Sequence, residues 1–115
     1  MALKHARPEE VVDLRPLGAA LDGAKTSALV KTSAFEAIRL IVPAGAELPP
    51  HKVSGQITLH CLEGHVQLGT SKAVLDLQAG DWVYLEGGEM HWLKGLEPSS
   101  LLLTILFENS AAAES

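Results

Sequence analysis

Two histidines, His51 and His91, lie in the stretches of the sequence best suited to carry chemistry. His51 belongs to residues 43–69 and His91 to residues 80–95, and in both stretches short apolar runs alternate with glycine-containing turns. Such strand–turn–strand units are typical of closed antiparallel barrels. We therefore expect the two histidines to face each other inside a small barrel and to line one ligand pocket.

Metal binding is the first chemistry that this pair suggests. Imidazole is the commonest protein ligand of divalent transition metals, but a stable site needs three or four ligands. Gln56 and His60 are the first candidates for a third ligand, and Cys61 and Glu63 also lie within reach along the chain. Strand alternation places Gln56 and His60 on one face and Cys61 on the other. A bulge of one residue after Gly55 would exchange these faces, so the sequence leaves the third ligand open.

The same histidines have a second interpretation, in which no metal binds. Buried imidazoles need hydrogen-bond partners, and an organic ligand, a water molecule or the other histidine would serve. For His60, we prefer a surface or interface position to a role as a metal ligand. Cys61 lies between Leu59 and Leu62 in an apolar run, which indicates a small core residue rather than a nucleophile.

Three aromatic residues, Trp82, Tyr84 and Trp92, surround the second histidine in the sequence. Either they pack in the core and at an interface, or some of them line the mouth of the pocket and stack on a ligand. With Gln56 and the two histidines, they complete the set of residues that we expect around the ligand. No arrangement typical of a serine hydrolase, a phosphate-binding loop or a carboxylate pair is recognisable, so no catalytic residue is assigned.

The two histidine-bearing stretches resemble the two motifs of the cupin superfamily. In the first motif a glycine precedes an H-x-H pair, an acidic ligand and a closing glycine; in the second, two glycines precede one histidine. The matching positions are Gly45, His51 and Gly64 in the first motif and Gly80, Gly88 and His91 in the second. The resemblance covers about residues 35–107. It implies an all-β protein with a single antiparallel, RmlC-like cupin β-barrel of the jelly-roll type.

Four positions depart from the cupin motifs. Val53 stands in place of the second histidine of H-x-H, and Ile57 in place of the acidic or glutamine ligand. Glu86 replaces a proline, and Gly95 replaces an asparagine. The first motif is therefore degenerate, and the resemblance indicates the fold more strongly than it indicates metal chemistry.

The composition describes one globular domain. The chain has 115 residues, of which 47% are hydrophobic and 20% charged, which is enough for a single core. A net charge of −5 without a basic cluster argues against nucleic acid. Because no apolar stretch could span a membrane and no signal peptide is recognisable, we expect a cytoplasmic protein with no membrane partner. A single cysteine excludes an internal disulfide.

Strand-like segments follow one another at short intervals along the chain. We expect strands over residues 25–31, 35–42, 57–62, 66–68, 73–77, 82–85 and 100–107. Residues 11–14 are expected to form a short strand and residues 16–21 a helical turn that ends before Gly23. The single domain, residues 1–115, thus has an N-terminal segment of about residues 9–31, a barrel of about 35–107 and a flexible tail at 109–115.

Three functions fit these features. The first is a small-molecule-binding barrel of unassigned biochemical role, with His51 and His91 in the pocket. The second is a metal-dependent enzyme on a small organic acid, of the dioxygenase, isomerase or decarboxylase class that cupins include; the third is an accessory or structural dimer with a degenerate site. Both faces of residues 35–42 carry apolar side chains, which a monomer would leave in water. We therefore expect a homodimer.

Overall fold

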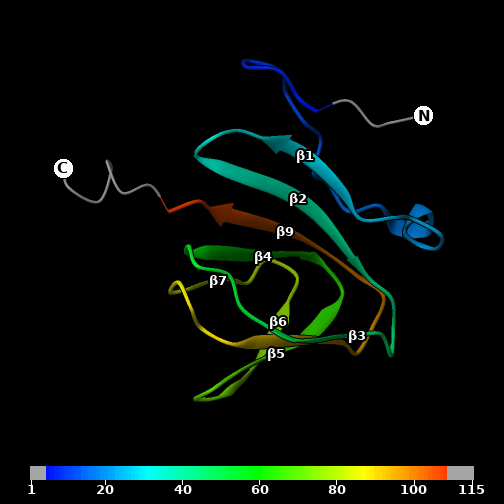
Figure 1. The fold of residues 1–115 in the computed structure, drawn as a ribbon. Coiled ribbons are helices and arrows are strands. Elements are labelled where there is room, and N and C mark those ends of the chain that lie inside the picture. The colour runs from blue at the N-terminus through cyan, green and yellow to red at the C-terminus, as the bar shows by residue number, and fades with distance from the viewer. Residues whose placement is uncertain (1–4, 109–115) are drawn as a thin grey trace.

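Nine β-strands and one 3₁₀ turn make up residues 5–108, the part of the chain described by this computed structural model (Figure 1). The elements are η1 (Gly18–Leu21), β1 (Ser27–Lys31), β2 (Phe35–Val42), β3 (Glu47–His51), β4 (Ile57–Glu63), β5 (His65–Thr70), β6 (Val74–Gln78), β7 (Trp82–Leu85), β8 (His91–Gly95) and β9 (Ser99–Leu106). All pairings are antiparallel. The all-β prediction is confirmed.

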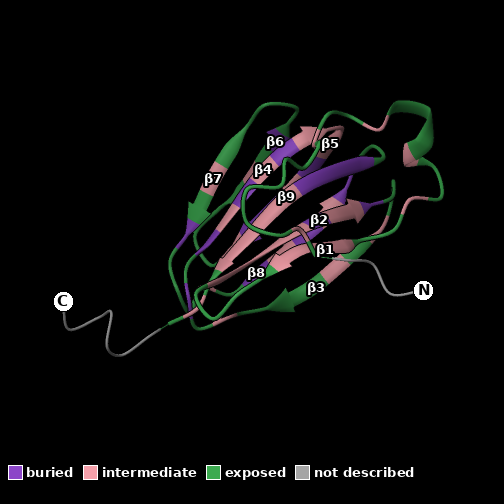
Figure 2. Cartoon of the chain, turned by 90° about the horizontal axis from the view of Figure 1, so that it is seen from above, coloured by how far each residue is buried: buried purple, intermediate pink, exposed green. Residues whose placement is uncertain are grey.

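The strands form two sheets that face each other. One has the order β1-β2-β9-β4-β7 and the other the order β3-β8-β5-β6. In Figure 1 the larger sheet lies above the smaller one, and Figure 2 shows buried residues on strands such as β4 and β9. The core between the sheets is built by Val42, Ile57, Leu59, Cys61, Val66, Leu68, Leu77, Leu85, Leu93 and Leu101.

The register of β4 decides which of its side chains enter the core. Ile57, Leu59 and Cys61 are buried, and the side chains between them are only half-buried. Because neighbours alternate between the faces of a strand, His60 lies on the outer face of the sheet. No bulge after Gly55 exchanges the two faces of this strand.

Most of the predicted strands agree with the structure, but residues 11–14 do not form the expected strand. They are irregular, and the Val11 side chain is 94% exposed. The carbonyl oxygens of Asp13 and Arg15 accept hydrogen bonds from the guanidinium of Arg39 instead of joining a ladder. The predicted turn at residues 16–21 is present as η1, whereas the predicted tail, 109–115, lies outside the described residues.

A partly buried carboxylate fixes this N-terminal segment to the larger sheet. Glu63 accepts hydrogen bonds from the backbone N–H groups of Leu17 and Gly18 and from the Ser100 hydroxyl. Its carboxylate also lies 3.6 Å from the Arg39 guanidinium. Burial raises the pKa of Glu63, but the three hydrogen bonds and the charge of Arg39 outweigh burial and hold that pKa below its usual value. The N-terminal segment is thus held to the larger sheet by hydrogen bonds to a charged carboxylate.

Within residues 5–108, no helix has both the length and the apolar character needed to cross a membrane.

Candidate functional site

His51 and His91 lie directly opposite each other on neighbouring strands. They are partners in the ladder between β3 and β8, and their ring centroids are 4.4 Å apart with the planes tilted by 58°. Pro49 and Pro50 have no N–H to donate, and the ladder accordingly shifts between Leu48 and His51. An edge strand tolerates this interruption, and the shift brings His51 into register with His91.

Two loops that precede β4 and β8 hold the histidine pair in place. The N–H of Gly88 donates to the carbonyl oxygen of Val53 over 2.7 Å, which ties the two loops together. Gly88 has a φ of 82°, a conformation that favours glycine. A Cβ at Gly87 would come within 2.0 Å of the carbonyl oxygen of Ser54, so this close approach also requires glycine.

Hydrogen bonds to the backbone determine which nitrogen each histidine offers. The Nδ1 atom of His51 lies 3.0 Å from the carbonyl oxygen of Pro49, and that of His91 lies 3.0 Å from the carbonyl oxygen of Glu89. A carbonyl oxygen only accepts, so Nδ1 must carry the hydrogen in both rings. In the neutral imidazole Nε2 then has a free lone pair, and both residues line the same cavity.

The cavity beside the two histidines is aliphatic and has a volume of about 310 Å³. Its wall is formed by Leu40, Leu48, Pro49, Ile57, Leu59, Leu93 and Leu103 together with His51 and His91. His91 is only 5% exposed, whereas His51 is exposed. The histidine pair therefore extends from the interior to the solvent and supplies the only side-chain polar groups among these lining residues.

The other residues expected around the ligand lie elsewhere. Gln56 is exposed ahead of β4 and does not line the cavity. Trp82 and Tyr84 are 59% and 52% exposed on β7. Trp82 is the ladder partner of His60, so both side chains lie on the outer face of the larger sheet.

Trp92 also lies away from the cavity, because its indole occupies the space above Gly69. A Cβ at Gly69 would come within 1.9 Å of the indole ring. The lining residues that the sequence interpretation missed, such as Leu40 and Leu103, are the inward members of β2 and β9. Their alternation along each strand was the available signal, but it does not distinguish a cavity wall from a filled core.

Solved structures similar to this one identify the architecture. A conserved protein of unknown function from Streptococcus pyogenes matches with a TM-score of 0.75 and 17% identity over 95% of this chain and 96% of that one. A cupin superfamily protein from Desulfitobacterium hafniense matches with a TM-score of 0.75 and 16% identity over 94% and 100% of the two chains. The chain has the cupin fold. An RmlC-like cupin from Shewanella frigidimarina also matches, with a TM-score of 0.68 and 17% identity over 76% and 78%.

No family model and no curated protein matches the sequence. The cupin fold is therefore established by structure, while the chemistry of the cupin cavity must come from its own residues.

The residues of this cupin cavity do not fit a metal centre with three or four protein ligands. Within residues 5–108, no group of three or more histidine, cysteine, aspartate or glutamate side chains could hold a metal ion. Ile57, at the position of the usual acidic ligand, is buried and lines the cavity. His60 lies on the outer face, and Cys61 is fully buried within the core. Burial raises the pKa of the Cys61 thiol, so it stays protonated at neutral pH.

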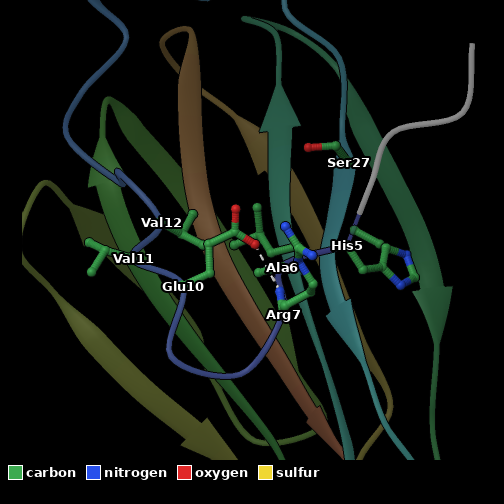
Figure 3. Close-up of a pocket in the computed structure, with 9 residues that line it drawn as sticks. His5, Ala6, Arg7, Glu10, Val11, Val12 and Ser27 are labelled. Atoms are coloured by element: carbon green, nitrogen blue, oxygen red, sulfur yellow. Dashed lines mark hydrogen bonds between the residues drawn. The ribbon is translucent and has the colours of Figure 1, made fainter.

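A second hollow, of about 320 Å³, lies between β1 and residues 5–12 (Figure 3). Its side chains include His5, Arg7 and Glu10, all of which are exposed. The backbone N–H of Arg7 donates to the Glu10 carboxylate over 2.9 Å. This contact closes a local turn. Because these polar side chains of the hollow are exposed to solvent, it is a weaker candidate than the aliphatic cavity.

Proposed function

We propose that the protein binds a small organic molecule in the cavity lined by His51 and His91. One observation carries the proposal: two imidazoles with their Nδ1 atoms engaged by the backbone stand at an otherwise aliphatic cavity. The cavity volume, about 310 Å³, is at the lower end of the range for small-molecule sites. A ligand that is apolar over most of its surface and polar at one end would match both parts of the wall.

A metal-dependent enzyme has less support. Imidazole pairs bind transition metals weakly unless further ligands contribute, and in residues 5–108 the third ligand is missing. The binding module is therefore the function that we propose.

The binding proposal is tested with two neutral probes, methylcyclohexane and cyclohexanol, in a titration followed through the NMR signals of leucine and isoleucine methyl groups. Both probes are expected to shift the signals of cavity residues such as Leu93 in a saturable way. Leu103→Phe fills the cavity and should weaken both probes, whereas Leu106→Phe, an exposed site on the same strand, should not. If neither probe gives a saturable shift in the wild type, the proposed function is wrong.

We also propose that two copies of the chain associate through the outer face around β7. Trp82 and Tyr84 expose large aromatic surfaces there, with ring centroids 6.4 Å apart. Their ladder partners on β4, His60 and Thr58, add no carboxylate, lysine or arginine. Large aromatic side chains are enriched in the cores of interfaces between protein chains, so this face is where we place the second copy.

A further inference from the structure

We infer that the histidine cavity selects small uncharged aliphatic alcohols, and diols most strongly, over carboxylic acids and amines with the same carbon skeleton. The inference rests on the proposed function, because it assigns a ligand class to the same cavity. It uses three features of the wall: the two acceptor atoms, the lack of charged side chains and the aliphatic surface.

The first feature is a pair of neighbouring hydrogen-bond acceptors. In both His51 and His91, Nδ1 donates to a backbone carbonyl oxygen, so the neutral ring accepts at Nε2. The rest of the cavity wall consists of leucines, isoleucine and proline, whose side chains carry no donor. The complement of two adjacent acceptors is a ligand with two donors, and the two hydroxyl hydrogens of a vicinal diol meet this requirement.

The second feature is the absence of charge among the lining residues. No aspartate, glutamate, lysine or arginine lines the cavity in the described chain. A carboxylate that moved from water into the cavity would find no cationic side chain to pair with. It would also face the lone pairs of the two Nε2 atoms. An ammonium group would bring donors, but it would lose its hydration without meeting a carboxylate. A hydroxyl group carries a smaller desolvation cost, and the two Nε2 atoms compensate it.

The third feature is the shape and chemistry of the remaining wall. Leu40, Ile57, Leu59 and Leu103 come from the larger sheet, and Leu93 comes from the smaller sheet. The ligand body is thus enclosed by aliphatic groups from two sides. Among the described residues, no aromatic ring other than the imidazoles lines the cavity, so a branched or cyclic aliphatic skeleton fits this wall without relying on stacking.

The test uses four probes that share one ring: a vicinal cyclohexanediol, cyclohexanol, cyclohexanecarboxylate and cyclohexylamine. Dissociation constants are measured at pH 8 by titration of the methyl signals, with methylcyclohexane as the reference without a polar group. The diol is expected to bind about tenfold or more tightly than the carboxylate and the amine. In the double variant His51→Leu/His91→Leu, the diol should lose about tenfold in affinity while methylcyclohexane keeps or improves its own.

Two results would overturn the inference and leave the proposed function intact: carboxylate binding as tight as diol binding in the wild type, or a diol affinity that the double variant does not change. Failure of every probe, methylcyclohexane included, would instead contradict the proposed function. The comparison of probes in the wild type needs no variant, so it decides the question even if the double variant does not fold.

Discussion

His51 and His91 are ladder partners across β3 and β8, with ring centroids 4.4 Å apart. This relationship depends on local features of the chain that lie far apart in sequence. Pro49 and Pro50 interrupt the ladder ahead of His51, and the glycine turn at Gly87 and Gly88 sets the start of β8. Together they place two neighbouring imidazoles in the wall of an aliphatic cavity.

Replacing Ile57 by histidine should create a three-histidine metal site. Ile57 lines the same cavity as His51 and His91, so the new imidazole would face the existing pair. We expect Ile57→His to bind zinc about tenfold or more tightly than the wild type in a calorimetric titration at pH 7.5, since three ligands replace two. Without metal, the buried imidazole should lower the free energy of unfolding by about 1–3 kcal/mol.

Two further variants control this experiment. Val53→His should gain less zinc affinity than Ile57→His, because Val53 packs against the core and does not line the cavity. Adding His91→Ala to Ile57→His should remove the gain. Unchanged zinc affinity in that double variant would mean that the metal binds outside the cavity.

Gly87→Ala should disturb the site through the two loops that hold it. The new Cβ would come within 2.0 Å of the Ser54 carbonyl oxygen, so one loop must move. We expect a loss of about 1–3 kcal/mol in the free energy of unfolding and weaker binding of cyclohexanol. Denaturant unfolding and the methyl titration measure the two effects. Wild-type values of both would show that the loop contact does not position the histidines.

The ion pair between Glu63 and Arg39 should make a large contribution to stability. Arg39 is 8% exposed, so removing its partner leaves a buried charge uncompensated. Glu63→Ala is expected to cost about 3 kcal/mol in denaturant unfolding at pH 7. Adding Arg39→Met should cost less than the sum of the single changes, because it removes the unpaired charge. If the losses in unfolding free energy of the two single variants simply add in the double variant, the ion pair does not contribute as proposed.

The same carboxylate predicts a pH dependence of stability. The pKa of Glu63 is lowered in the folded protein from the ordinary value of 4.5. Its stabilising contribution is therefore complete above that value and is lost as the pH falls through the lower folded pKa. Glu63→Gln has no carboxylate to protonate, so its stability should fall less steeply than that of the wild type below about pH 4.5. Parallel curves from urea unfolding at several pH values would refute this role.

The sequence predicts the fold better than it predicts the site. Alternation in residues such as Ile57, Leu59 and Cys61 predicts both the strand and its inner face, because burial on one face follows a period of two. The glycines that flank His51 and His91 also single out the histidine pair. The closeness of Trp82 and Tyr84 to His91 in sequence suggests a place at the pocket, but their strand presents them outward. Sequence proximity does not specify the face of a sheet.

The aromatic face around β7 should hold two copies of the chain together. Static light scattering of the wild type at micromolar concentration should give about twice the monomer mass of 12.2 kDa. Trp82→Ser/Tyr84→Ser should give the monomer mass, while Val74→Ser should remain dimeric, because Val74 is an exposed apolar residue of the other sheet. A monomeric wild type, or a dimeric double variant, would exclude this interface.

The most direct test of the proposed site is the position of the hydrogen on each imidazole. Two-dimensional ¹H–¹⁵N NMR of the histidine side chains, recorded at pH 8 with and without a vicinal cyclohexanediol, distinguishes a protonated from an unprotonated ring nitrogen. We predict that Nδ1 carries the hydrogen in both His51 and His91, and that saturating diol shifts the two Nε2 signals as they accept hydrogen bonds. Hydrogen on Nε2 of either ring, or Nε2 signals that the diol leaves unchanged, would contradict the account of this cavity.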